Sequence, residues 1–162
     1  MATTTVPDVL INLQAQLAAR PALIGPPKVA VHLIDLDTYT DPEAIVFGRV
    51  FVAGATTFAW GSVEGSRATL EPPSLSGYVY VTLPGDSDSK AADALRRGGT
   101  LLEEVMQQLR DDPSLQGALA GRARRAPLVE SAAWTTGLAQ LDQVAVVRLY
   151  IDWTISWNAV TF

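Results

Sequence analysis

The stretch QVAVVRLYIDWTISW, residues 143–157, decides the fold of this chain. From Ala145 onward every second residue is apolar, and the positions between them are mostly polar. Successive side chains of a β-strand leave on opposite faces, so this alternation predicts a long strand with one face in a core. The opposite face carries Arg148, Tyr150 and Asp152, and its role could be catalysis, binding or contact with water.

Helical spacing of apolar residues predicts two main helices. The first covers residues 7–19 and starts at Pro7, because proline is favoured in the first turn of a helix. The second covers residues 90–110, because its apolar stripe continues through the pair Gly98–Gly99 without a change of spacing. Gly99 falls on that stripe, where a missing side chain permits close approach to a strand or to another helix; a plain kink of the helix is the alternative.

The remaining segments predict strands joined by turns. Strands are expected at residues 28–36, 45–52, 56–61, 77–84 and 128–136, with a hairpin joining 45–52 to 56–61 through residues 53–55. Residues 62–77 are rich in glycine, proline and serine and are expected to form a loop, and LAQLDQ, residues 138–143, is expected to turn the chain. This order predicts an α+β fold in a single domain over residues 1–162: a mostly antiparallel sheet of about five to six strands, with the two main helices packed on one face.

The composition favours an ordinary folded core. Residues of the hydrophobic class make up 48% of the 162 residues, and the chain has no cysteine, so disulfides, thiolate catalysis and cysteine-bound metals are excluded. The net charge of −5 argues against a nucleic-acid binder driven by phosphate neutralisation. The beginning of the chain lacks the pattern of a signal peptide, and no run of eighteen apolar residues occurs, so we expect a soluble protein made in the cytoplasm.

Few residues offer chemistry. His32 is the single histidine and lies on a predicted strand, which rules out a histidine-rich metal site. The acidic residues Asp35, Asp37, Asp41 and Glu43 match a calcium loop only in part, so a solvated turn is the better interpretation. We therefore expect no enzyme, no cofactor and no metal.

Arginines gather in two places, the pair Arg96–Arg97 and the run formed by Arg122, Arg124 and Arg125. Seven acidic residues in the surrounding stretch could pair with them across the surface, and this is the favoured interpretation. The alternative is a contact with another subunit, because arginine is enriched at protein interfaces.

The segments ADALRRGGTLLEEVMQQLRDDPSLQGAL, residues 92–119, and DQVAVVRLYIDWTISW, residues 142–157, together resemble the small tail terminator, or tail completion, proteins of long-tailed bacteriophages. ARPALIGPPKV, residues 19–29, is similar to their beginnings. The resemblance implies a structural virion protein that forms a hexameric ring, caps the tail tube, ends tube polymerisation and joins the tail to the head–neck complex.

The same resemblance implies the partners. These are other copies of the chain in a homohexamer, the tail tube protein and a head–tail connector or neck protein, in the tail–neck region of a virion assembled in the host cytoplasm. DNA would pass through the ring without sequence-specific binding, and no membrane is involved. The residues expected at contacts are Glu64 and Arg67 in the loop, Arg122, Arg124 and Arg125 in the basic run, and Arg148, Tyr150 and Asp152 on the polar face of the last strand.

Two alternatives stay open. A head–tail connector stopper is another small neck protein that the same pattern could describe. A non-viral ligand-binding or enzymatic α+β domain would instead be indicated by a deep pocket containing His32 or the pair Asp35–Asp37.

Overall fold

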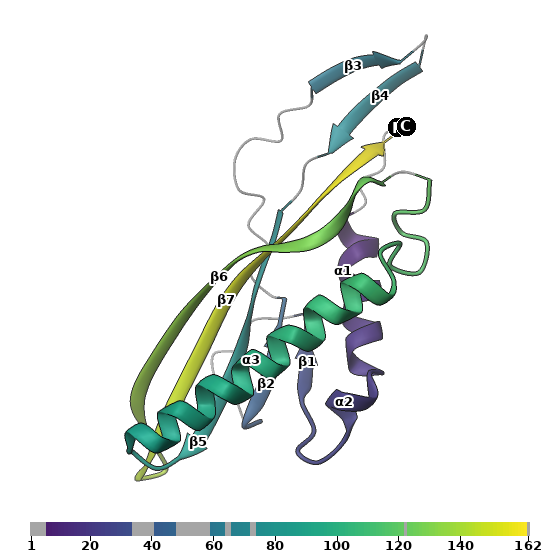
Figure 1. The fold of residues 1–162 in the computed structure, drawn as a ribbon. Coiled ribbons are helices and arrows are strands. Elements are labelled where there is room, and N and C mark those ends of the chain that lie inside the picture. The colour runs from purple at the N-terminus through teal and green to yellow at the C-terminus, as the bar shows by residue number, and fades with distance from the viewer. Residues whose placement is uncertain are drawn as a thin grey trace.

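The computed structural model describes residues 6–33, 41–47, 59–63, 66–71, 74–121 and 123–161. Within these ranges the elements are the helices α1 (Val6–Ala18), α2 (Pro21–Ile24) and α3 (Asp88–Asp111), and the strands β1 (Ala30–His32), β2 (Glu43–Val46), β3 (Ala59–Val63), β4 (Ser66–Glu71), β5 (Ser74–Pro84), β6 (Ala123–Leu141) and β7 (Val144–Thr161) (Figure 1). The predicted long helix and long last strand are both present.

The strands form one mixed sheet built around β7. The order is β1-β2-β5-β7-β4-β3, and β6 pairs with β7 along its other edge. The pair β1 and β2 is parallel, and all other pairs are antiparallel. The predicted α+β class with a mostly antiparallel sheet is confirmed, although the described sheet has seven strands rather than five or six.

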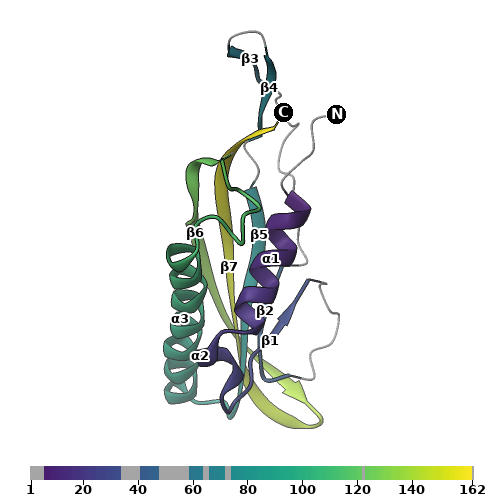
Figure 2. The ribbon, with the colours of Figure 1, turned by 90° about the vertical axis from the view of Figure 1, so that its right-hand side faces the viewer.

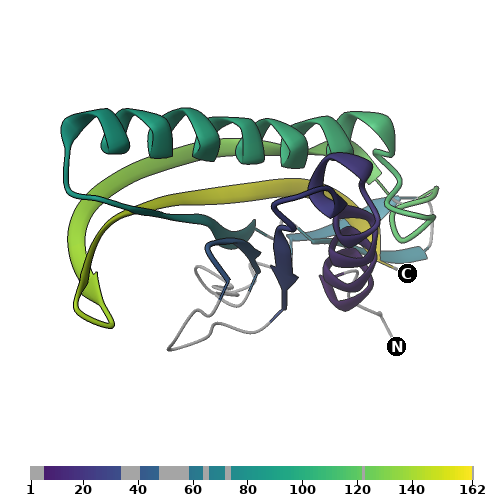
Figure 3. The ribbon, with the colours of Figure 1, turned by 90° about the horizontal axis from the view of Figure 1, so that it is seen from below.

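One face of β7 lies in the core, as the alternating sequence predicts. Its inward side chains are no more than 2% exposed: Val147, Leu149, Ile151, Trp153, Ile155 and Trp157. The same cluster includes buried residues of both α1 and α3, so the two main helices pack on this face. Figure 3 shows α3 lying along the β6–β7 pair.

The two helices are also tied to each other by polar contacts. Arg20, just after α1, donates hydrogen bonds to the side chains of Glu104, Gln108 and Asp111 in α3. The contacts with Glu104 and Asp111 raise the pKa of Arg20, and the hydrogen bond to Glu104 contributes most to the rise. Leu13 and other apolar residues of α1 are buried in the core. Core packing and the hydrogen bonds of Arg20 therefore together hold the C-terminal end of α1 against α3.

The close approach of α3 to the sheet occurs at Gly98, not at the predicted Gly99. Gly98 is buried, and a Cβ atom there would overlap Leu149 Cδ2 and lie 2.8 Å from Ile151 Cδ1. The helix turns about 100° per residue, so only one of two adjacent glycines can face the strand directly below it. Because glycine has no Cβ atom, α3 can pack closely against β7 at Gly98.

The predicted hairpin between residues 45–52 and 56–61 is wrong. β2 lies between β1 and β5, whereas β3 pairs with β4 at the far end of the sheet. Residues 53–55, the predicted connection, lie outside the described residues. The apolar run after residue 45 looked like one arm of a local hairpin, but its first residues find their partner in β5, more than thirty residues later.

The predicted loop over residues 62–77 is also wrong. It contains β4 and the start of β5, and the two strands follow β7 in the same register, with Glu71 opposite Ala159 and Ser74 opposite Ser156. Two prolines, residues 72 and 73, stand between them. Proline cannot donate a hydrogen bond to a neighbouring strand, so a stretch with two prolines is typical of a loop. The residues on either side of the prolines are nevertheless extended, in β4 and β5.

β6 is longer than predicted at both ends. It begins inside GRARRAP, residues 121–127, and continues through residues 138–141, which were expected to turn. The reversal is limited to Asp142 and Gln143, both with positive φ, between the paired residues Leu141 and Val144. Positive φ at both positions is the geometry of a tight two-residue hairpin.

Candidate interaction surface

The outer edge of β6 is unpaired among the described strands. β6 pairs with β7 along one side, and no other described strand lies along its second side. Residues 130–138 are all exposed, although they lie in a regular strand of the sheet. A long open edge is a template for pairing with another chain, so proteins normally blunt it.

The first half of β6 carries such protection. Its register with β7 shifts three times before Ser131, which marks bulges or irregularities. Pro127 also lies in this half, and proline lacks the N–H group that an added strand would need. Added pairing is therefore disfavoured over residues 123–130.

The second half of β6, residues 131–141, has none of these devices, and we call it the regular edge. Its register with β7 is unbroken from Ser131 to Leu141, and it contains no proline and no charged residue. Three large apolar side chains on it are open to solvent: Trp134 with 45% exposure, Leu138 with 68% and Leu141 with 36%. A strand of this kind left open in water is an aggregation site, which favours a partner.

Trp134 lies beside the second glycine of α3. A Cβ atom at Gly99 would be 3.4 Å from Trp134 Cη2, an ordinary contact distance, so the indole ring reaches the helix there. Leu95, one turn earlier in α3, is also exposed. The helix therefore covers part of Trp134 and leaves the rest available to a partner.

The polar face of β7 contains an aromatic contact that its sequence does not indicate. Tyr150 is half-buried and packs near Tyr78 and Tyr80 of β5, with ring centroids 5.9 and 5.1 Å away. The two β5 tyrosines belong to a second buried cluster with Ala44 and Val46, on the side of the sheet away from the main core. Tyr150 thus joins an aromatic cluster, which its position between polar neighbours did not reveal.

Arg148 and Asp152 lie on the same face as Tyr150. Arg148 is half-buried between Thr82 and Gly137 on the adjacent strands, and its Nε atom has no hydrogen-bond partner among the described residues. Asp152 is exposed. The structure places these residues on the sheet face expected for them, and their roles in contacts with a partner stay predictions.

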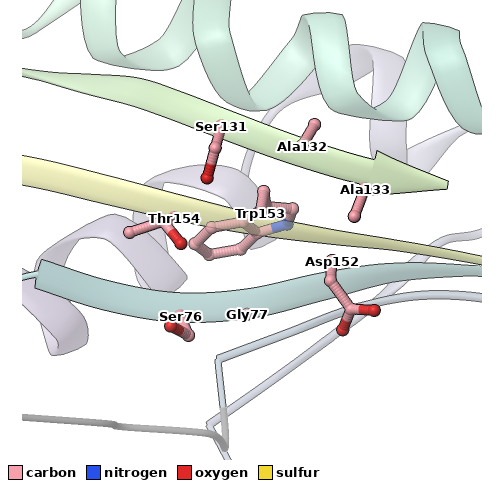
Figure 4. Close-up of a pocket in the computed structure, with 8 residues that line it drawn as sticks. All are labelled: Ser76, Gly77, Ser131, Ala132, Ala133, Asp152, Trp153 and Thr154. Atoms are coloured by element: carbon pink, nitrogen blue, oxygen red, sulfur yellow. The ribbon is translucent and has the colours of Figure 1, made fainter. Parts of the chain in front are cut away.

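A pocket of about 320 Å³ opens between β5, β7 and β6 (Figure 4). It is lined by Ser76, Gly77, Ser131, Ala132, Ala133, Asp152, Trp153 and Thr154. Asp152 is the one ionisable group in this lining, so the pocket offers no pair of groups for general acid–base catalysis. His32 is not part of it, and Asp35 and Asp37 lie outside the described residues.

The other chemical candidates lie outside the pocket. His32 Nε2 lies 3.6 Å from a carboxylate oxygen of Asp41, which is beyond hydrogen-bond distance, and this nitrogen has no hydrogen-bond partner among the described residues. Glu43, expected in a solvated loop, is buried instead at the start of β2 and accepts two hydrogen bonds from Arg97, at 2.8 and 2.7 Å. In the part of the chain that the structure describes, no group of three or more potential ligand side chains could hold a metal ion.

The arginines of α3 pair within the chain. Arg97 binds Glu43, whose hydrogen bonds raise the pKa of the guanidinium, and Arg96 lies 3.2 Å from Asp93. Pairing across the surface was the favoured interpretation for this pair, and it is confirmed for Arg96. It is wrong for Arg97, whose partner Glu43 is buried and comes from a distant part of the chain. Glu64 and Arg122 lie outside the described residues. The backbones of Arg67, Arg124 and Arg125 lie in β4 and β6, and their side chains lie outside the described atoms.

The turn after α3 explains one part of the resemblance in structural terms. The carboxylate of Asp112 accepts hydrogen bonds from Ser114 and from the backbone N–H of Gln116. These contacts, the side chain of Ser114 first, lower the pKa of Asp112. They hold a left-handed run of positive φ from Leu115 to Gly117, and Leu115 enters the core. The DPSLQG motif is thus a helix stop that anchors the chain before β6.

The regular edge was missed by reasoning from the sequence. A signal was present, because residues 131–141 combine β-forming residues with a complete lack of charge and proline. That signal was hidden because both faces of this strand are exposed, so it lacks the alternation that marks a half-buried strand.

No protein-family model and no curated protein matches this chain. Among solved structures, a chain of "Virion of native gene transfer agent (GTA) particle" is similar, with 97% of this chain and 99% of that chain covered, 12% identity and a TM-score of 0.39. A likeness at that identity and score leaves the function to be argued from the residues. No helix in the described ranges is long and apolar enough to cross a membrane.

Proposed function

We propose that this protein is a structural virion subunit of the tail terminator type, which assembles into a ring at the end of a phage tail tube. The observation that carries the proposal is the regular edge, residues 131–141. It is an uncharged strand edge with exposed Trp134 and Leu138, and no described strand lies along it.

The physical argument is that such an edge belongs to a complex. The protein blunts the first half of β6 with bulges and Pro127 but leaves the second half open. Selective protection along one strand is expected where the unprotected half is covered by a partner. Backbone hydrogen bonds from an added strand and burial of the exposed apolar side chains would then stabilise the assembly.

The sequence resemblance supports the choice of a tail terminator among assembly subunits. Its segments correspond to α3, to the turn held by Asp112 and to β7. α3 and β7 contribute to the core, and β7 pairs with the regular edge on β6. The ring would contact the tail tube protein on one side and a connector or neck protein on the other. Enzymatic activity is not part of the proposal.

The test is light scattering coupled to size exclusion, on the protein alone and mixed with the tail tube protein, followed by negative-stain imaging. A hexameric ring in either condition supports the proposal, and monomers in both refute it. Copurification with a portal or adaptor protein in place of tube protein would favour the stopper.

A matched pair of variants connects the assembly to the edge. Leu138→Lys places a charge on the regular edge, whereas Ile11→Lys places the same charge on α1 at a side chain that is also exposed, at 53%. Both variants should fold as the wild type does, by circular dichroism. Only Leu138→Lys should lose the ring, and a ring that survives this change would contradict the role of the edge.

A further inference from the structure

The structure contains a second open strand edge, in the hairpin formed by β3 and β4. β3 pairs with β4 from Ala59 opposite Leu70 to Val63 opposite Ser66, and it pairs with no other described strand. Figures 1 and 2 show this hairpin projecting past the end of β7, away from α1 and α3. β7 supports the hairpin through only three paired residues of β4, and the outer edge of β3 is a template for pairing with another strand.

The charged residues of the hairpin lie outside β3. β3 contains no charged residue, and the charged residues of the hairpin lie in the link or in β4: Glu64, Arg67 and Glu71. The regular edge of β6 is uncharged as well. Pairing these two strands would therefore bury no unpaired charge, which is the costly error at an interface.

We propose that β3 of one copy adds to the regular edge of β6 in a second copy. This inference rests on the proposed function and identifies the two surfaces that join neighbouring subunits. Pairing β3 with β6 covers the open edges of these two strands at once, whereas pairing two β6 edges with each other would leave β3 open.

The pairing must occur between copies. β4 holds its hairpin beside Thr161 and the two residues before it at the end of β7, whereas the regular edge pairs with residues 144–154 near the other end. The two joined surfaces are different, so the contact is head-to-tail, and it closes into a ring when the rotation per subunit permits.

The sizes of the two surfaces are compatible. β3 has 5 residues, so it covers about half of the regular edge. Trp134 and Leu138 lie on the same face of β6, because residues four apart in a strand share a face. Side chains of the incoming strand on that face would bury the exposed parts of both, as in other cases of strand addition.

Cysteine cross-linking tests the contact cleanly, because the natural chain has no cysteine. One cysteine is placed in β3, by Gly61→Cys or Ser62→Cys, and one in the regular edge, by Ala133→Cys or Thr135→Cys. Successive positions are used because they point to opposite faces of a strand. Each of the four double variants is oxidised mildly, alone and with tail tube protein, and its assembly is measured by light scattering before oxidation.

The expected result is a ladder of covalent multimers in at least one double variant and in none of the single ones. The control pair, Ile11→Cys with Ser62→Cys, should give no ladder. Covalent dimers from a single cysteine in β6 would overturn the inference, because they show two β6 edges facing each other.

The remaining outcomes separate this inference from the proposed function. Oligomers that form by light scattering but give no ladder in any of the four double variants overturn the β3–β6 contact and leave the proposed function standing. Monomers in every condition overturn both.

Discussion

Gly98 and Gly99 are neighbours in α3, yet they border two regions with opposite properties. Gly98 faces Leu149 and Ile151 in the core, where every side chain is covered. Gly99 faces Trp134 on the regular edge, where almost half of the indole is open. The fold and the proposed assembly therefore involve separate residues, so we expect that each can be disrupted without the other.

The largest expected effect comes from a matched pair of tryptophans. Trp153 is 1% exposed and packs against Phe47 at a centroid distance of 5.2 Å, so Trp153→Ala should lower the free energy of unfolding by about 3–5 kcal/mol. Trp134→Ala should cost much less stability and should weaken assembly instead. Denaturant unfolding and light scattering on both variants check this, and equal losses of stability would remove the distinction between the regions.

The next effect concerns the buried ion pair of α3 with the sheet. Arg97→Ala leaves the buried carboxylate of Glu43 without its partner and should cost about 3 kcal/mol of unfolding free energy. Arg96→Ala is the control, because Arg96 and Asp93 form an exposed pair that contributes less than about 1 kcal/mol. Chemical denaturation measures both, and a similar small loss in each would show that Glu43 is not held by Arg97.

Replacing each of the two glycines of α3 with alanine should change the stability of the fold in opposite directions. Gly98→Ala gains about 1 kcal/mol of helix propensity but overpacks the contact with Leu149 by roughly 1–3 kcal/mol, giving a net loss of stability. Gly99→Ala meets only an ordinary contact and should gain up to about 1 kcal/mol. Thermal unfolding of the two variants decides the matter, and a gain in Gly98→Ala would place the close approach elsewhere.

The smallest effect is a pH dependence at the end of α3. Hydrogen bonds lower the pKa of Asp112 in the folded state, so its stabilising effect is present above the unfolded pKa and is lost as the pH falls through the folded value. Asp112→Asn should therefore cost about 1 kcal/mol at neutral pH and progressively less in acid. Unfolding curves at neutral and acidic pH would contradict this if the difference between the two proteins stayed constant.

The sequence predicts the elements that are buried on one side. β7 alternates because one of its faces meets α1 and α3, and α3 keeps its apolar stripe because Leu101, Val105 and others enter the same core. One-sided burial is the physical origin of both periodicities, so both elements were found with nearly correct bounds.

The wrong predictions concern segments that are not buried on one side only. β6 is exposed over residues 130–138 and shows no alternation, so its length and its open edge stayed hidden. β4 precedes two prolines, which resemble a loop in composition although β4 and β5 follow the same partner. The candidate contacts Arg148, Tyr150 and Asp152 lie on the predicted face, but the alternating pattern does not indicate that Tyr150 packs near Tyr78 and Tyr80 of β5.

The most direct test of the central claim is amide hydrogen exchange over residues 131–141, measured in the assembled protein and in the dissociated subunit. In a strand, alternate N–H groups point away from the paired neighbour, so the outward amides of the regular edge should exchange rapidly in the free subunit. We expect these amides to become protected on assembly. Assembled protein in which they exchange as rapidly as in the free subunit would contradict it.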